Sequence, residues 1–424
     1  MLVITFTLGT GSIVRAASTE KILYSFGFIF PDGSNPEGGL VFDNAGNLYG
    51  TTIGGGNGGY GTVYLLSPSV NGWTETILYS FCPNCAGGSS PIGSLVIDAG
   101  GNLYGTANSG GNSSLCGGGC GVVFELSPGT GGWTETVIYT FSGPDGARPI
   151  AGLALDVHGN LYGTTPYGGA SNHCPSGLAP GCGVVFKLTK NSTGTWTETV
   201  LHSFQGGSDG DTPSARVTLD SLGNVYGTTA GSMSSDPGTV FKLVRTKTGK
   251  WNETVLYRFK GTTDGNSPEA GVVLGHSGAV YGTTRYGGSG TCSAFGYSGC
   301  GTVFELQDLN GTWNETVLYS FNGGTDGADP AAGVIFGANG DLYGTTAEGG
   351  AISTCGNNGC GTLFKLAPST GGSWKETQLI RFNESAGDGA YPLGDLILDK
   401  VGNIYSTTQY GGTYNSGAVF EANP

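Results

Sequence analysis

Charged residues are scarce in this chain, and basic residues are the scarcest. Asp, Glu, Lys and Arg make up 11% of the 424 residues, and 17 Lys and Arg stand against 31 Asp and Glu, which gives a net charge of −14. Such a balance repels phosphate backbones and anionic membrane surfaces. We therefore expect no nucleic-acid partner. The acidity itself requires no ligand, because net charge also keeps an exported protein soluble.

Long hydrophobic runs, histidines and catalytic signatures are also few. No stretch approaches the roughly 18 apolar residues of a membrane helix, so we expect no membrane insertion. Neither G-x-S-x-G nor H-E-x-x-H occurs, and the four histidines have no recognisable partner or ligand spacing. These are His158, His173, His202 and His276. The sequence therefore identifies no catalytic residue, and it predicts no cofactor apart from the calcium alternative described below.

The first 17 residues have the pattern of a signal peptide. An apolar segment from Leu2 to Leu8 is followed by Ala16 and Ala17, a small-residue cleavage site. An ordinary first strand is the alternative. We expect a soluble secreted protein, extracellular or periplasmic, and no anchor, because no hydrophobic tail precedes Asn423 and Pro424.

The ten cysteines fall into five close pairs, and an even count in an exported chain favours disulfides. The pairs are Cys82 and Cys85, Cys116 and Cys120, Cys174 and Cys182, Cys292 and Cys300, and Cys355 and Cys360. Zinc is the rival interpretation, but only the first pair has the C-x2-C spacing and no histidine is suitably placed.

Glycine and aromatic residues are plentiful, and they recur in a regular pattern. The 83 glycines and 11% aromatics are typical of many short strands joined by tight turns. A Tyr followed by Gly-Thr or a close variant marks seven units with a period of about 60 residues. The marker tyrosines are Tyr49, Tyr104, Tyr162, Tyr226, Tyr281, Tyr343 and Tyr405.

Each unit contains four apolar runs of strand length. In the sixth unit they are Glu315 to Phe321, Gly333 to Phe336, Asp341 to Thr346 and Gly361 to Leu366. We predict an all-β, seven-bladed propeller of four-stranded blades over residues 18–424. The repeats are 18–72, 73–132, 133–195, 196–250, 251–312, 313–373 and 374–424. A solenoid or two sandwiches could also use four-strand units.

The two ends of the chain favour the propeller. The last unit stops at its fourth run, Gly417 to Glu421, while the chain after the signal peptide begins with Ser18 to Phe26, which aligns with the first run of the other units. The N-terminal strand is therefore predicted to complete the last blade and close the ring. Neither alternative explains this complementary pair of ends. We expect a monomer.

The repeats resemble those of the GloVer tandem-repeat family of exported bacterial proteins. The pattern reads Gly39 to Asp43, then Gly46 to Thr52, and Gly238 to Leu243 for the G-T-V-F-K-L segment, and the match covers residues 18–424. The D-x-x-G-N-L-Y part is also similar to NHL and gluconolactonase-type propeller blades. The resemblance implies an exported repeat protein and no established activity.

One side of the predicted ring carries longer and more varied loops, which follow the first and third runs of each unit. Binding residues concentrate on such loops. Residues just after the Thr-Thr pair differ between units, and their aromatic and polar groups could contact a glycan or a surface protein. The candidates are Tyr167, Arg285, Tyr286, Glu348, Gln409 and Tyr410. Simple loop packing is the alternative.

An aspartate recurs in six of the loops that follow the first run. Oxygen-rich rings can hold Ca²⁺, so Asp209, Asp264 and Asp326 form a weak calcium alternative. Asp before Gly is also ordinary turn chemistry. The second unit has Cys82 to Cys85 in place of the aspartate, which suggests a shared structural role.

The sequence leaves two candidate functions open, and an inert structural module is a third possibility. Regular repeats and the lack of a catalytic constellation favour a non-catalytic binding or scaffold module for polysaccharide or a cell-surface protein. The alternative is an extracellular lyase or hydrolase on a glycan or lactone, with carboxylates near the central channel. Fold by itself does not decide between them.

Overall fold

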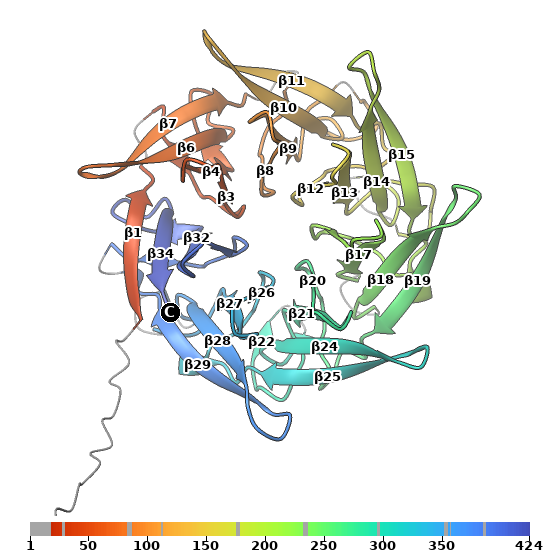
Figure 1. The fold of residues 1–424 in the computed structure, drawn as a ribbon, viewed down its shortest axis with the longest axis vertical. Helices are drawn as coiled ribbons and strands as arrows, with labels where there is room; N and C mark the ends of the chain where they lie inside the picture. The colour runs from red at the N-terminus through yellow and green to blue at the C-terminus, as the bar shows by residue number, and fades with distance from the viewer. Residues whose placement is uncertain are drawn as a thin grey trace, which may run out of the picture.

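Seven four-stranded antiparallel sheets stand around a central axis, as Figure 1 shows for this computed structural model. The structure describes residues 18–27, 30–82, 87–111, 113–174, 179–231, 236–294, 297–351, 355–356, 358–384 and 387–424. Each sheet is one blade, and its shortest strand faces the axis. The predicted seven-bladed propeller is confirmed.

The blades follow one another in chain order, and the strands of each run from the inner to the outer position. Blade 1 contains β3 (Val41–Phe42), β4 (Leu48–Thr52), β6 (Thr62–Ser69) and β7 (Gly72–Ser80). Blade 2 contains β8 (Val96–Ile97), β9 (Leu103–Ala107), β10 (Val122–Gly129) and β11 (Gly132–Thr140). Blade 3 contains β12 (Ala154–Leu155), β13 (Leu161–Thr165), β14 (Val184–Lys190) and β15 (Trp196–Ser203). Blade 4 contains β16 (Thr218–Leu219), β17 (Val225–Thr229), β18 (Thr239–Arg245) and β19 (Trp251–Arg258).

The remaining blades repeat this plan. Blade 5 contains β20 (Val273–Leu274), β21 (Val280–Thr284), β24 (Thr302–Leu309) and β25 (Thr312–Ser320). Blade 6 contains β26 (Ile335–Phe336), β27 (Leu342–Thr346), β28 (Thr362–Pro368) and β29 (Trp374–Arg381). Blade 7 contains β31 (Ile397–Leu398), β32 (Ile404–Thr408), β34 (Ala418–Asn423) and β1 (Thr19–Ser25).

The ring closes through a strand from each end of the chain. β1 pairs with β34 in antiparallel register, with Ile22 opposite Phe420 and Thr19 opposite Asn423. In Figure 1 the red first strand lies beside the blue last one. The predicted closure is confirmed, whereas the predicted signal peptide lies outside the described residues.

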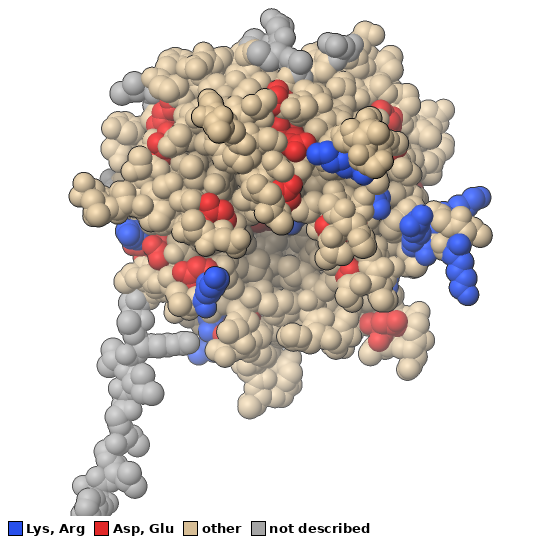
Figure 2. Space-filling model, turned by 45° about the horizontal axis from the view of Figure 1, so that its top comes forward, with Lys and Arg blue, Asp and Glu red and all other residues tan. Residues whose placement is uncertain are grey.

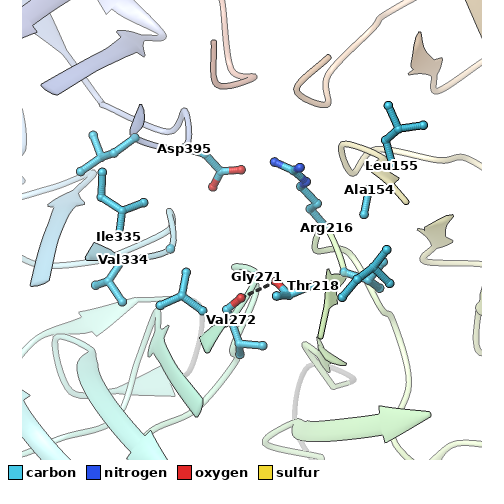
Figure 3. A pocket seen from close by; sticks show the side chains of 14 residues that line it. Ala154, Leu155, Arg216, Thr218, Gly271, Val272, Val334, Ile335 and Asp395 are labelled. Carbon is cyan, nitrogen blue, oxygen red and sulfur yellow. Dashed lines mark hydrogen bonds between the residues drawn. The ribbon is translucent and has the colours of Figure 1, made fainter. Parts of the chain in front are cut away.

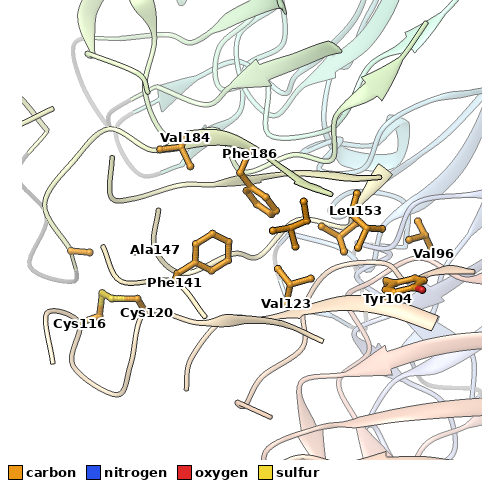
Figure 4. Close-up of a cluster of buried hydrophobic side chains, with 13 residues drawn as sticks. Val96, Tyr104, Cys116, Cys120, Val123, Phe141, Ala147, Leu153, Val184 and Phe186 are labelled. Atoms are coloured by element: carbon orange, nitrogen blue, oxygen red, sulfur yellow. A yellow bond between two sulfur atoms is a disulfide. The ribbon is translucent and has the colours of Figure 1, made fainter. Parts of the chain in front are cut away.

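The marker motif is explained by packing inside each blade. Gly163 lies opposite Phe186 in the register of β13 and β14, and a Cβ on Gly163 would lie 2.6 Å from the end of that phenylalanine ring. A larger residue would therefore displace the aromatic side chain. The ring of Phe186 in turn packs edge to face on Phe141 from the previous blade, with 5.1 Å between centroids. Figure 4 shows this cluster between blades 2 and 3.

Threonines after the marker tyrosine connect neighbouring blades. The hydroxyl of Thr51 donates to the carbonyl of Gly93 in the next blade at 3.2 Å, and that of Thr407 donates to Gly38 across the closure at 2.9 Å. Tryptophans make a second connection, since Trp133 of blade 2 packs on Tyr49 of blade 1. The repeated motif residues are thus structural.

Short accessory elements occur in the loops between strands. They are the sheets β2 (Gly33–Ser34) with β5 (Gly54–Gly55), β22 (Ser293–Ala294) with β23 (Tyr297–Ser298), and β30 (Gly389–Ala390) with β33 (Tyr410–Gly411), and the 3-10 turns η1 (Gly207–Asp209) and η2 (Gly324–Asp326).

Local disulfides close four of the loops, as predicted. They join Cys116 to Cys120, Cys174 to Cys182, Cys292 to Cys300 and Cys355 to Cys360. The fifth predicted pair includes Cys85, which lies outside the described residues. In the part of the chain that is described, no helix is long and apolar enough to span a membrane.

Candidate functional site

The two faces of the ring differ in the way that strand alternation predicts. We call the face that carries the loops after the first and third runs the loop side, and the face that carries the hairpin turns the turn side. On the turn side, Asp43 accepts hydrogen bonds from the backbone N–H groups of Ala45 and Asn47 at 2.8 and 2.9 Å. Asp98, Asp156, Asp220 and Asp399 repeat this contact. This face is therefore built from uniform turns.

On the loop side, Arg285 is already neutralised by its neighbours. Its guanidinium donates two hydrogen bonds to Asp329, at 2.6 and 2.5 Å, and one to Glu269 at 2.8 Å. These carboxylates precede blades 6 and 5, so the arginine joins two blades. Paired charge of this kind leaves little cationic potential for a ligand.

The other predicted binding residues have different surroundings. Tyr286 is buried and stacks on Tyr297 with 4.7 Å between centroids. Glu348 accepts a hydrogen bond from Asn358 at 2.9 Å, Gln409 donates one to Glu37, and Tyr167 is half-buried. The structure does not bring the six predicted residues together. Their role in binding stays a prediction.

Tyr410 differs because it belongs to an exposed aromatic cluster. All four exposed aromatic residues of the described chain lie in the loop-side segments of units 1 and 7. They are Phe30, Tyr60, Tyr410 and Tyr414, with 68%, 40%, 38% and 55% of their surface exposed. We call this set the closure patch. On the turn side, the large exposed hydrophobic residues are all aliphatic: Val70, Val157, Leu222, Val244, Leu309 and Val401.

The segments that contribute the closure patch contact one another. The backbone N–H of Asn35 donates to Ser416 at 2.7 Å, and that of Gly56 donates to Asp32 at 2.8 Å. The segment around Phe30 therefore lies between the loops that contain Tyr414 and Tyr60. Exposed aromatic rings can stack on sugar rings, and the polar groups of the surrounding loops can bind the sugar hydroxyls.

The three aspartates of the calcium alternative belong to separate loops. Asp264 accepts hydrogen bonds from Tyr257 and the N–H of Lys260, both at 2.9 Å, and Asp326 does the same with Tyr319 and Asn322. Asp209 pairs with His202 at 3.2 Å. Among the described residues, no group of three or more His, Cys, Asp or Glu could hold a metal ion. These contacts are those of turn residues.

The central channel holds a cavity of about 380 Å³. Its lining comes from the inner strands of blades 3 to 6 and from the residues just before the inner strands of blades 4 to 7, and it is mainly Val, Leu, Ile and Ala. Of the described residues that line it, only Arg216 and Asp395 are charged. Figure 3 shows these two side chains pointing toward one another from different sides of the channel.

Arg216 and Asp395 occupy the same position of the repeat, three residues after its proline. We call the seven residues at this position the collar: Gly39, Ser94, Gly152, Arg216, Gly271, Gly333 and Asp395. The N–H of Gly39 donates to Ser94 at 2.8 Å, and a Cβ on Gly39 would lie 2.8 Å from the carbonyl oxygen of Asp395. Collar residues of adjacent blades thus contact one another. Five of the seven collar residues are Gly or Ser, and the two exceptions are Arg216 and Asp395.

Sequence reasoning missed both collar charges. Loop lengths and cysteines, which distinguish the irregular units, do not include the residues that follow each proline. Aligning the seven Pro-x-x-x segments would have identified Arg216 and Asp395 as the exceptions. The sequence did not reveal that they share a cavity, because this depends on the closed ring.

In the outer strand of every blade, a glutamate recurs with one carboxylate oxygen buried. We call these the rim glutamates: Glu20, Glu75, Glu135, Glu198, Glu253, Glu315 and Glu376. In each, Oε1 has no hydrogen-bond partner in the described chain. Burial, with the charge of Asp32 next in size, raises the pKa of Glu75 to about 8. Burial and the charge of Asp145 raise the pKa of Glu198 to about 7.

The outer surface carries few charges. In the view of Figure 2, Lys, Arg, Asp and Glu are separated by wide areas of uncharged residues around a hollowed centre. This agrees with the 11% of charged residues in the sequence. Contacts with a large partner on such a surface would be mainly uncharged.

The comparisons with known proteins identify the repeat. A sequence model described as the Gloeobacter/Verrucomicrobia repeat matches the chain three times, over residues 4–174, 173–295 and 290–424. The resemblance read from the motif is thereby confirmed. No curated protein matches the chain in sequence.

Solved structures share the fold at low identity. A polysaccharide lyase described as an ulvan lyase has a TM-score of 0.51 and 10% identity, and the alignment covers 94% of each chain. A protein from Lactobacillus plantarum has a TM-score of 0.49 and 14% identity over 86% of this chain and 98% of its own. A protein provisionally described as a gluconolactonase has a TM-score of 0.40 and 12% identity over 78% and 89%. At such identities the likeness shows the fold alone.

Proposed function

Because this chain belongs to the Gloeobacter/Verrucomicrobia repeat family along its whole ring, we propose that it acts as one exported, non-catalytic binding module that contacts a polysaccharide through its loop side. The closure patch is the observation that supports this function. It gathers every exposed aromatic residue of the described chain on one side of the ring. The local disulfides agree with an extracellular or periplasmic location.

The chemistry of the loop side favours a neutral polysaccharide. Tyrosine combines an apolar ring face with a hydroxyl, which matches the alternating apolar and polar faces of a sugar ring. Fixed positive charge is scarce there, since Arg285 is paired with Asp329 and Glu269. The net charge of −14 also disfavours an acidic polymer.

A glycan array tests this proposal with the full-length protein. We expect retention on neutral glycans, and about tenfold weaker binding when Tyr410→Ala and Tyr414→Ala are combined, because two stacking surfaces are lost. The control is Leu222→Ala, which removes an exposed side chain from the turn side. Equal binding by all three proteins would contradict the closure patch, and retention on no glycan of the array would contradict polysaccharide as the ligand.

The second candidate function is a lyase or hydrolase acting at the channel, and Asp395 is the observation that favours it. Cleavage with paired carboxylates requires two such groups, and the described lining of the cavity contains one. Product analysis of every array ligand separates the two functions. Product that disappears with Asp395→Asn would establish the enzyme and end the non-catalytic proposal.

A further inference from the structure

The central channel holds a cation and an anion that the rest of the described chain does not neutralise. Arg216 is exposed within the channel and Asp395 is half-buried. Neither side chain forms a hydrogen bond or an ion pair of 4.0 Å or less with any described residue. The walls between them are Val, Leu, Ile and Ala. Half-burial removes part of the hydration of Asp395 without giving it a partner, which costs free energy.

Blade packing does not require either charge. Gly271 and Gly333 occupy the same collar position in blades 5 and 6, and their blades have the same strands and register as blade 4. A Cβ on Gly271 would lie 2.8 Å from the carbonyl oxygen of Arg216, so contact across the collar is made by backbone. The repeat is therefore broken twice at one cavity without a structural need.

We infer that the central channel binds a small zwitterion with an aliphatic side chain, of the class of the branched-chain amino acids. The guanidinium of Arg216 pairs with the ligand carboxylate, and the carboxylate of Asp395 accepts hydrogen bonds from the ligand ammonium. The aliphatic part lies against Leu219, Val273 and Ile335, which line the cavity and are partly exposed. A cavity of about 380 Å³ is within the range of small-ligand sites.

Charge balance selects a zwitterion over an acid or an amine. A ligand with only a carboxylate would leave Asp395 unpaired, and a ligand with only an ammonium would leave Arg216 unpaired. A zwitterion neutralises both groups and adds no net charge to the channel. This site is separate from the closure patch, so it stands or falls independently of polysaccharide binding.

Calorimetric titration of the full-length protein with leucine tests the inference. Leucine is compared with 4-methylpentanoate, which lacks the ammonium, and with 3-methylbutylamine, which lacks the carboxylate. The third comparison is gluconate, which keeps the carboxylate but has hydroxyls in place of both the ammonium and the aliphatic chain. We expect leucine to bind at least about tenfold more tightly than each of the others, because each lacks one charged hydrogen bond. No binding of leucine, or equal binding of gluconate or either analogue, would overturn the proposal.

Two variants identify the residues. Arg216→Gly and Asp395→Gly restore the residue found elsewhere in the collar, and each is expected to weaken leucine binding at least about tenfold. Lys250→Gly removes one cation from an exposed turn and should bind leucine like the parent. Undiminished binding by both collar variants would refute the assignment. A thermal melt of each variant distinguishes lost binding from lost folding, and a collapse of the fold in both would show that the charges are structural and refute it as well.

Discussion

The rim and the collar are both sevenfold sets of equivalent positions, but they differ in how strictly they repeat. At the rim the same glutamate occurs in all seven units. At the collar five small residues are interrupted by Arg216 and Asp395. Repetition without exception is expected where each blade solves the same packing problem. An exception inside a cavity indicates a requirement that packing does not impose.

The rim shows what uniform repetition provides. Six rim glutamates face an aspartate from the preceding loop, for example Glu198 with Asp145 and Glu376 with Asp326. The loop of the second unit lacks the aspartate, and Glu135 of the third unit faces Tyr79 there instead. A protonated glutamate can donate a hydrogen bond toward the opposing carboxylate, which an ionised glutamate cannot do. The aspartates proposed as calcium ligands thus also belong to contacts between blades.

The largest expected effect comes from the repeated core, where a single change should damage the ring. Phe186→Ala removes a fully buried ring that packs on Phe141, and we expect it to lower the free energy of unfolding by about 3–5 kcal/mol. Urea unfolding followed by tryptophan fluorescence measures it. A loss below about 1 kcal/mol would mean that blades 2 and 3 do not share this core.

The next effect is a loss of stability as pH rises, and it originates at the rim. A glutamate whose pKa is raised on folding binds its proton more tightly in the folded state. Its contribution is complete below the unfolded pKa and disappears as pH rises through the folded pKa, which is about 7 for Glu198 and about 9 for Glu20. Thermal melts should therefore show a melting temperature that falls between pH 5 and pH 9.

A matched pair of variants assigns this fall to the rim. Glu198 faces Asp145 and Tyr139 across the blade boundary, so Glu198→Gln should raise the melting temperature at pH 9 and change it little at pH 5. Asp308→Asn removes the same charge from the exposed end of β24. If both variants changed the pH dependence equally, net charge and not the rim would be responsible.

A smaller effect is expected where blade 1 departs from the other blades. Tyr64 replaces the core phenylalanine, and its hydroxyl is fully buried without a hydrogen-bond partner in the described chain. Tyr64→Phe should raise the free energy of unfolding by about 1 kcal/mol, because an unsatisfied polar group is removed. Urea unfolding checks the sign. A loss of stability would show that the hydroxyl has a function in packing against Gly50, which lies opposite it.

The smallest effect on the free energy of unfolding is expected at the collar, where packing does not require the charged residue, in contrast to the rim. Arg216→Gly should change the free energy of unfolding by less than about 0.5 kcal/mol, since Gly271 and Gly333 fill the same position. Urea unfolding in the absence of ligand is the measurement. A loss of about 2 kcal/mol or more would place Arg216 with the structural residues of the rim.

The sequence by itself determined the number of blades, the closure of the ring by its first strand, the disulfide pairs within the described chain and the separation into two faces. Each of these follows from comparing one unit with the next, because strand period, turn residues and local cysteines act over short distances. Tyr410 was also identified in this way, as a loop residue of the varied side.

Only the tertiary structure decided which residues meet across blades. Arg285 was predicted as a binding residue, which stays a prediction, and the ring brings Asp329 and Glu269 to its guanidinium. Arg216 and Asp395, far apart in the chain, share one cavity because a closed ring places every inner strand around the same axis. Distances across that axis depend on the geometry of the closed ring, which no comparison between repeats contains.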